Sequence, residues 1–320
     1  MPARDHIGLT GPTYEVVVER GKIREFARAM QAPLDDFLTG EHPIVPPTFF
    51  VSVPYTWGYT LERPRGTVFE GFDHDLSVPL HAEEEFIFHG CPPRAGDSLT
   101  ARTSLENVVE KSGKNGGDLT FLTMLTEYRY PQGDLAVEQR SVTVTTSRSP
   151  ADKDWKLEAP DYAPAYLPDL DPADPFAALQ RASWDELAEG EGPGDIDTGP
   201  LLLRDIVRFM GVVGEDNALH YDIAWAHANG YPTVFGLGMH QASVLASYAV
   251  HWVDPASVRS LKAKFRAVTW PGDRMIYSGV VRRKFRDAQG RRCVDIALSC
   301  RRPDKIVVTE VEMHCVFDEA

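Results

Sequence analysis

The chain has 320 residues, of which 43% are hydrophobic and 25% are charged, and its formal net charge is −14. This length allows two domains of about 150 residues each. The acidic balance argues against a nucleic-acid partner, because phosphates require an excess of Lys and Arg.

No apolar run reaches the roughly 20 residues that cross a bilayer, and the first residues, MPARDHIGLTG, lack the apolar core of a secretory signal. The cysteines show neither close pairing nor metal-ligand spacing, so we expect neither a disulfide framework nor a metal site. The expectation is a cytoplasmic protein without membrane contact, metal or cofactor. The cysteines are Cys91, Cys293, Cys300 and Cys315.

The first predicted helix lies in VVVERGKIREFARAMQAP, where apolar residues recur on one helical face. The segment PPTFFVSVPYTWG follows, and then a strand begins in HAEEEFIF, whose Glu83, Glu84 and Glu85 we interpret as a solvated run. Two β-rich runs separated by PQGD, LTFLTMLTEYRY and LAVEQRSVTVTT, predict an antiparallel hairpin. The residues on the helical face are Ile23, Phe26, Ala27 and Met30.

The second half repeats this order weakly. LLLRDIVRFMGVVGED has the shape of the first helix, and GLGMHQASVLASYAV takes the place of PPTFFVSVPYTWG. The Gly272-Asp273 turn matches Gly96-Asp97, and CVDIALSCRR with IVVTEVEMHCVF forms the closing hairpin. One buried helix followed by long antiparallel strands, given twice, predicts an α+β fold with a sheet wrapped around each helix.

The predicted organisation is an N-terminal domain over residues 1–150, a linker over residues 151–180 and a C-terminal domain over residues 181–320. The density of Pro and Asp in the linker argues against regular structure there. We expect it to lie along the surface of the protein.

The candidate site is FMGVVGEDNALHYDIAWA, at 209–226. After Gly214 come Glu215, Asp216, Asn217 and His220. An acid and an imidazole on one short loop can activate a water molecule. The IAWAHANG segment behind them predicts a short helix capped by Asp222.

Gly238 opens the apolar run that follows, which predicts a buried helix over Gly238–Val250. The backbone N–H groups at a helix N-terminus carry partial positive charge and suit a developing oxyanion. Glycine there lets a substrate approach the backbone closely. The neighbouring Gly-x-Gly at 236–238 is not a dinucleotide fingerprint, and His240 is expected to be a satisfied core residue.

On these residues the chain resembles the MaoC-like (R)-specific enoyl-CoA hydratase and 3-hydroxyacyl dehydratase family, in its double hotdog form. The family signature Gly-Asp-x-Asn-Pro-(Leu/Ile)-His reads here as Gly-Glu-Asp-Asn-Ala-Leu-His at 214–220. Two departures are Glu215 in place of Asp and Ala218 in place of Pro. Glu215 is the favoured acid, and Asp216 is the alternative if the loop shifts by one residue.

The resemblance implies hydration of trans-2-enoyl-CoA to (3R)-3-hydroxyacyl-CoA, or the reverse dehydration, with no cofactor. Glu215, His220, Asn217 and Gly238 would form one active site per chain. Aligned through the helices, Glu215 falls on Ala32 and His220 on Phe37, so the N-terminal half is interpreted as a degenerate domain with room for a long or bulky acyl group. Two alternatives stay open, an acyl-CoA thioesterase and a non-catalytic subunit that completes a partner hydratase.

The expected partner is an acyl-CoA, with acyl carrier protein as another carrier. From His251 to Lys305 the chain has 14 basic residues against five acidic ones, which could hold the phosphates of coenzyme A or simply be solvated strand faces. A double hotdog chain resembles a dimer in one polypeptide, so a monomer or a homodimer is expected.

Overall fold

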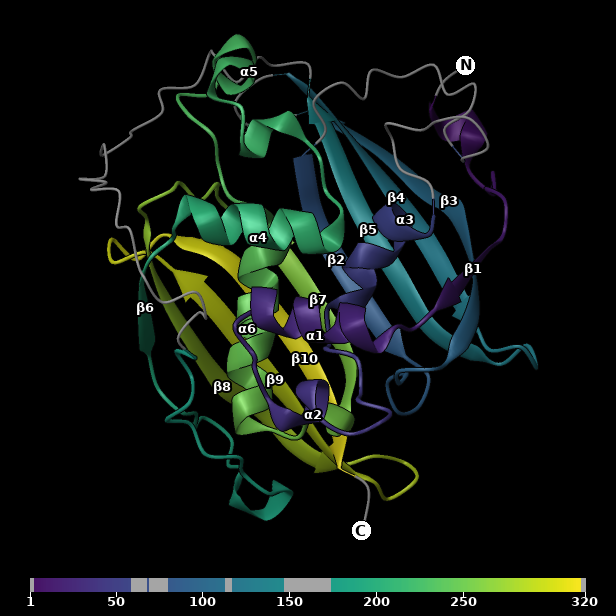
Figure 1. Ribbon diagram of the computed structural model, residues 1–320, viewed down its shortest axis with the longest axis vertical. Helices are drawn as coiled ribbons and strands as arrows, with labels where there is room; N and C mark the ends of the chain where they lie inside the picture. Colours follow the sequence, from purple (N-terminus) through teal and green to yellow (C-terminus); the bar gives the residue numbers. More distant parts are fainter. Residues whose placement is uncertain (1–2, 59–67, 69–79, 113–116, 147–173, 318–320) are drawn as a thin grey trace.

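The computed structural model describes residues 3–58, 68, 80–112, 117–146 and 174–317. Ten β-strands form one antiparallel sheet, and helices α1, α4 and α6 lie on the same face of it (Figure 1). The first half contains η1 (Ala3–His6), β1 (Tyr14–Val17), α1 (Arg20–Ala29), α2 (Asp35–Leu38), η2 (Phe49–Ser52), α3 (Val53–Thr56), β2 (Leu80–Phe88), β3 (Ser98–Ser112), β4 (Asp118–Arg129) and β5 (Leu135–Thr146). The second half contains η4 (Trp184–Glu186), β6 (Ile196–Pro200), α4 (Leu203–Val213), η5 (Ala218–His220), α5 (Ile223–Ala228), α6 (Gly238–Trp252), η6 (Pro255–Ser257), β7 (Val258–Phe265), β8 (Arg274–Arg286), β9 (Arg292–Arg301) and β10 (Val307–Phe317).

The strand order shows that the two halves are copies of one unit. The order is β1-β3-β4-β5-β2-β7-β10-β9-β8-β6, so the second five strands mirror the first five. The halves join where β2 pairs antiparallel with β7, with Glu85 opposite Lys262. The weak repeat in the sequence is therefore a structural repeat, and both predicted hairpins are present as β4–β5 and β9–β10.

Each half also has the same turn before its longest strand. Gly96 has a φ of +95° and Gly272 a φ of +93°, which glycine adopts without a steric penalty. In each turn the next residue accepts a hydrogen bond from the backbone N–H three residues before it, at 2.8 Å for Asp97 and 2.9 Å for Asp273. The Gly-Asp match seen in the sequence therefore reflects one shared backbone geometry.

The two amphipathic helices, α1 and α4, pack against each other across the two halves. Phe26 and Phe209 meet with ring centroids 5.9 Å apart, and the Lys22 ammonium donates to the Val212 carbonyl. The predicted apolar faces are confirmed, because every residue on them is buried. These residues are Ile23, Phe26, Ala27, Met30, Ile206, Phe209, Met210 and Val213.

The central helix differs between the halves. In the C-terminal half α6 is buried along its length after Gly238, because the sheet surrounds it. In the N-terminal half, within the described residues, η2 and α3 occupy the corresponding place in the chain order, and Pro54 lies in the first turn of α3. The prediction of a long central helix thus holds for α6, whereas the described residues at the corresponding place in the first half form the short helices η2 and α3, with Pro54 as the second residue of α3.

Most of the predicted linker, residues 151–173, lies outside the described residues. Its described end packs on the C-terminal half. The Phe176 side chain is fully buried, with its ring 5.5 Å from that of Tyr248 and 5.8 Å from that of Tyr277. This end of the segment therefore lies against the protein, as expected for a surface-bound connection.

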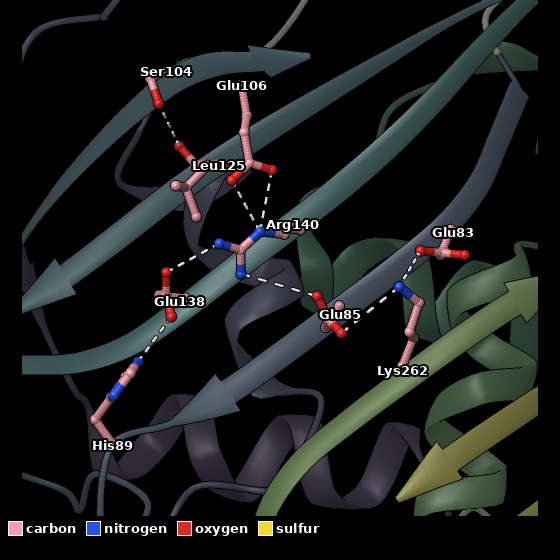
Figure 2. Close-up of polar contacts among 9 residues, drawn as sticks. All are labelled: Glu83, Glu85, His89, Ser104, Glu106, Leu125, Glu138, Arg140 and Lys262. Atoms are coloured by element: carbon pink, nitrogen blue, oxygen red, sulfur yellow. Dashed lines mark hydrogen bonds and ion pairs between the residues drawn. The ribbon is translucent and has the colours of Figure 1, made fainter. Parts of the chain in front are cut away.

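Charged side chains cross the junction of the two halves on the outer face of the sheet (Figure 2). Arg140 donates to both carboxylate oxygens of Glu106 at 3.1 Å and to Glu138 at 3.1 Å. Lys262 of β7 pairs with Glu83 of β2 at 2.6 Å, and Glu85 lies between Lys262 and Arg140. Two of the three predicted solvated glutamates, Glu83 and Glu85, therefore take part in ion pairs that link the halves.

Candidate active site

The helix that carries the candidate loop ends at Gly214. This residue has a φ of +82°, and its N–H donates to the Met210 carbonyl at 2.8 Å. A Cβ at this position would lie 3.1 Å from the Cβ of Tyr55. The left-handed backbone and the close contact both favour glycine, so α4 stops here and places Glu215 at the start of the loop.

Short-range hydrogen bonds fix the loop between Gly214 and His220. The Glu215 carboxylate accepts the Asn217 N–H at 3.0 Å, and the Asn217 side-chain oxygen accepts the Leu219 N–H at 3.1 Å. Asn217 thereby caps η5 and orients the loop. Asp216 is exposed, whereas Glu215 is partly buried. The burial favours Glu215 over Asp216 as the acid.

His220 is buried, and one of its ring nitrogens is already engaged. Its Nδ1 lies 2.8 Å from the Phe235 carbonyl oxygen, and its ring packs edge-on against the Phe235 ring at 5.0 Å. Because a carbonyl only accepts, Nδ1 carries the proton and Nε2 keeps its lone pair. Burial lowers the pKa of His220 to about 4, against a smaller opposing effect of the Phe235 bond. His220 is therefore a neutral base at physiological pH.

The Phe235 carbonyl stands three residues before Gly238, where α6 begins. The N-cap residue of this helix is Leu237, whose side chain makes no capping hydrogen bond. The first N–H groups of a helix have no partner inside it, so an uncapped start can accept an anionic oxygen. A Cβ on Gly238 would come within 2.6 Å of the Phe265 ring. The glycine is thus required by Phe265 of β7, a reason the sequence did not reveal.

The structure therefore ties the four predicted residues to two adjacent segments. Glu215, Asn217 and His220 share one loop, and the His220–Phe235 bond fastens that loop to the segment leading into Gly238. Asp222 caps α5 behind them by accepting the Trp225 N–H at 3.0 Å, as predicted. These two linked segments therefore carry a neutral imidazole, a carboxylate and a helix N-terminus, which are groups that the addition of water next to a polarised carbonyl uses.

The N-terminal half ends its first helix in the same way. Gln31 has a φ of +60°, as Gly214 has +82°. The next N–H bonds to the carbonyl five residues earlier in both halves, at 2.8 Å for Ala32 and 3.1 Å for Glu215. Counting from these matched ends places Phe37 of α2 at the position of His220. Ala32 and Phe37 are both fully buried and have no proton to transfer.

The sequence interpretation missed two polar residues of β2, Glu84 and His81, which contact each other. Glu84 is 1% exposed, so the prediction that it belongs to a solvated run is wrong. Its side chain lies on the buried face of β2, together with Phe86 and Phe88, whereas Glu83 and Glu85 lie on the other face. The alternation of faces along a strand makes this pattern visible in the sequence. His81, which contacts Glu84, had no such signal.

His240 is buried in α6, but its Nε2 has no hydrogen-bond partner within the described residues. The prediction of a core position is confirmed, and the prediction that it is satisfied is wrong. Burial lowers the pKa of His240 to about 4.

Many basic side chains of the stretch from His251 to Lys305 form ion pairs, with acids inside the stretch and outside it. Within the described residues, six of its arginines form ion pairs with Asp or Glu. These are Arg266, Arg274, Arg283, Arg291, Arg301 and Arg302. The pairing matches the interpretation of this stretch as strand faces more closely than that of a phosphate site.

In the described part of the chain, no His, Cys, Asp and Glu side chains form a group that could hold a metal ion. The helices described there are too short or too polar to cross a membrane.

A helix wrapped by an antiparallel sheet, in a unit that occurs twice, defines the class of the protein as a double hotdog. Residues 5–139 match the family model described as "FAS1-like, dehydratase domain region". A Streptomyces avermitilis protein named "UPF0336 protein" is 29% identical over 117 residues, which make up 34% of this chain and 73% of that relative.

Solved structures match the whole chain. One described as "MaoC-like dehydratase" has a TM-score of 0.75 at 22% identity and covers 99% of this chain and 100% of its own. A MaoC-like dehydratase from Phytophthora capsici has a TM-score of 0.65 at 15% identity, over 99% and 98% of the two chains. A Mycobacterium tuberculosis protein described as having a double hotdog fold has a TM-score of 0.60 at 14% identity, over 98% of each chain. These matches confirm the predicted α+β double hotdog fold and the resemblance to MaoC-like dehydratases.

Proposed function

We propose that this protein hydrates trans-2-enoyl-CoA to (3R)-3-hydroxyacyl-CoA, or catalyses the reverse dehydration, at one site per chain in the C-terminal half. The matched family model and the structural neighbours are named for dehydratases, which supports hydro-lyase chemistry in general. The observation that carries the specific proposal is His220, whose Nδ1 is held by Phe235 next to the uncapped start of α6.

In the hydration direction, His220 Nε2 takes a proton from a water molecule whose oxygen bonds to C3. The electron pair of the C2=C3 bond moves to C2, with negative charge shared by the thioester oxygen. C2 then takes this proton back from His220, either directly or through Glu215 after His220 has passed the proton to that carboxylate, so one water is consumed and both side chains return to their starting state. The imidazole and the carboxylate each need to lie within about 3 Å of the shared water.

The thioester oxygen would lie at the first turn of α6. The N–H of Gly238 and the positive end of the helix dipole stabilise the charge that develops there. A donor of this kind typically contributes roughly 3 to 4 kcal/mol to the barrier. Because burial keeps His220 neutral, its protonated form is costly in the transition state, and the carboxylate of Glu215 offsets that cost.

The acyl chain would extend toward the N-terminal half. That half lacks an acid and an imidazole at Ala32 and Phe37, and its described central segment is two short helices where the other half has α6. We therefore propose a long or bulky acyl group as substrate. Faster turnover of a long-chain enoyl-CoA than of crotonyl-CoA is the expected result, and equal turnover of the two would contradict this part.

The test follows crotonyl-CoA by its enoyl absorbance while a thiol reagent monitors free coenzyme A. A hydratase lowers the absorbance without releasing thiol. Thiol release would identify a thioesterase instead, and the absence of both signals with crotonyl-CoA and a long-chain analogue would favour a non-catalytic subunit. Chiral analysis of the product separates the (3R) from the (3S) alcohol.

A further inference from the structure

The N-terminal half contains a chain of hydrogen-bonded side chains on the inner face of its sheet. The Tyr128 hydroxyl donates to the Gln139 amide oxygen at 2.6 Å, and the Gln139 amide nitrogen donates to Glu84 at 2.7 Å. The other Glu84 oxygen lies 2.8 Å from His81 Nε2. Tyr128, Gln139 and Glu84 are at most 4% exposed. A carboxylate is costly to bury, so its presence here needs a reason beyond packing.

The C-terminal half shows that the fold does not require these polar groups. Ala101 and Tyr277 each lie five residues beyond the matched turn glycines, and they pair with Tyr128 and Cys300 respectively. The pairing registers of the next strands then identify, for each of the three buried residues, the residue that occupies the same position in the C-terminal half. The positions of Tyr128, Gln139 and Glu84 are matched by Cys300, Val311 and Leu261.

The network ends beside the candidate active site. The His81 ring lies 4.8 Å from the Phe265 ring, and Phe265 is the residue that a Cβ on Gly238 would strike. The preceding residue, Leu80, packs against the apolar cluster that contains Leu219 and Phe235. His81 therefore stands next to the first turn of α6, on a strand of the opposite half from His220.

The surroundings of His81 set which ring nitrogen carries the proton. Nε2 faces the Glu84 carboxylate at 2.8 Å, the Glu83 carbonyl at 3.1 Å and the Ser141 hydroxyl at 3.2 Å. Two of these oxygens only accept, so Nε2 donates and Nδ1 of the neutral ring is an acceptor. The side chain is 30% exposed, and the hydrogen bonds of the described residues leave Nδ1 without a partner.

We propose that His81, positioned by Glu84, accepts a hydrogen bond from a hydroxyl group on the acyl chain beyond C3. The N-terminal half then selects acyl-CoA substrates that carry this hydroxyl. The inference rests on the proposed function for the position of the acyl chain, and its test includes a binding measurement that needs no turnover.

The experiment compares three chain-matched ligands by calorimetry: saturated acyl-CoA compounds that are unsubstituted, that carry one hydroxyl beyond C3, or that carry a keto group at the same carbon. A series of substituent positions along the chain is included. At one or more positions the wild type should bind the hydroxyl compound roughly tenfold more tightly than the unsubstituted one, the range expected for one hydrogen bond. The enoyl forms of the same ligands give the corresponding ratios of kcat/KM.

Two variants make the test specific. His81→Ala should abolish the preference while leaving affinity for the unsubstituted ligand within about twofold. Glu84→Gln presents an amide N–H to His81 Nε2, which moves the ring proton to Nδ1 and should shift the preference from the hydroxyl to the keto compound. The matched control is His89→Ala, because His89 follows the same strand but pairs with Glu138 on the outer face (Figure 2).

Each outcome decides between the proposals. A preference in binding without turnover would support the hydroxyl site and contradict the hydratase. Turnover with no preference at any position, or a preference that His81→Ala leaves intact, would overturn the hydroxyl site and leave the hydratase standing. If none of the thioesters binds, both proposals are wrong.

Discussion

The loops that follow α1 and α4 begin with the same backbone conformation but carry different side chains. Each helix stops at a residue with positive φ, and the next N–H reaches back five residues. In the first half the loop then presents Ala32 and Phe37 to the core, whereas in the second it presents Glu215 and His220. The loop geometry is therefore a property of the repeated unit, and the chemistry depends on a few side chains placed on it.

The inner faces of the two half-sheets also differ, but here the polar side chains lie in the N-terminal half. The C-terminal half, which holds the loop proposed as catalytic, lines its inner face with Leu261 and Val311 around α6. The N-terminal half, which has Ala32 and Phe37 at the positions of Glu215 and His220, has Glu84 and Gln139 at the matching positions of its sheet. Duplication has thus divided the work, with proton transfer proposed for one half and recognition for the other.

The largest expected effect comes from removing the base that distinguishes the two loops. His220→Asn should lower kcat with crotonyl-CoA by at least about 100-fold, the usual contribution of a general acid–base group. Asn keeps an N–H donor near the position of Nδ1 for the Phe235 carbonyl, so the melting temperature should change little. His227→Asn is the control, because His227 is exposed on α5 and its hydrogen bond among the described residues is with the Pro232 carbonyl, at 2.9 Å. Comparable losses in both variants would contradict the assignment.

The acid is tested by the pair Glu215→Gln and Asp216→Asn. Glu215→Gln should lower kcat by roughly 100-fold, because a neutral amide cannot support a protonated His220. Its oxygen can still accept the Asn217 N–H, so the loop should hold its shape. Asp216→Asn should change the rate less than about twofold. The reverse ranking would mean that the loop shifts by one residue when the substrate binds.

Acid should weaken the C-terminal half through its two buried imidazoles. Unfolded histidine takes up a proton near pH 6.5, whereas His220 and His240 do so only near pH 4, because burial lowers both pKa values. Protonation of the unfolded chain between these values lowers the free energy of unfolding, by about 2 kcal/mol per histidine at about pH 5. Urea unfolding of wild type and His240→Leu at neutral and acidic pH measures this. The His240→Leu variant should lose about half of the decrease in the free energy of unfolding that the two histidines cause between neutral and acidic pH. If its decrease equals that of the wild type, His240 does not titrate as stated.

The start of α6 is tested by comparing two glycines in helices of the same half. Gly238→Ala should destabilise the protein by about 1 to 3 kcal/mol, because its Cβ would overlap the Phe265 ring, and it should lower activity by displacing the first turn. Gly211→Ala in α4 meets no atom within 4 Å and should stabilise by about 0.5 to 1 kcal/mol. Activity and urea unfolding are measured on both. A harmless Gly238→Ala would show that Phe265 moves freely.

The smallest effect should come from exchanging the residues at the two helix ends. Gln31→Gly should raise the free energy of unfolding by up to about 1 kcal/mol, because glycine relieves the positive φ there. Gly214→Ala should lower it by roughly 1 to 2 kcal/mol, since it adds strain and approaches Tyr55. Urea unfolding gives both values, and a destabilising Gln31→Gly would indicate that the glutamine side chain makes contacts that outweigh the strain.

Patterns of local periodicity predicted much of the fold. The helical faces of α1 and α4 and the two closing hairpins follow from apolar spacing, and the Gly-Asp turns follow from the backbone freedom of glycine. The acid, amide and imidazole of the loop were found because they are close in sequence. Tertiary contacts decided the rest. The contact of Phe265 with Gly238, the bond from His220 to Phe235 and the position of His81 all join segments that are distant in the chain or depend on side-chain direction.

Glu84 illustrates an error that could have been avoided. Three consecutive glutamates suggest solvent, but alternation along a strand must turn the middle one toward the opposite face from its neighbours. The relief of buried charge by His81 and Gln139 is not visible in the sequence, so burial of a carboxylate seemed unfavourable. The division of the first half's central segment into the short helices η2 and α3 was also not visible in the sequence.

The pairing of β2 with β7 has a consequence for how the chain can be made. The outer strands, β1 and β6, have only four and five residues, so the margins of the sheet expose little unpaired backbone. The two strands at the centre have nine and eight residues. Either half produced separately would present such a strand as an open template for aggregation. Joining the halves in one polypeptide places the strand that covers each of these edges in the same molecule, so the pairing needs no encounter between two chains.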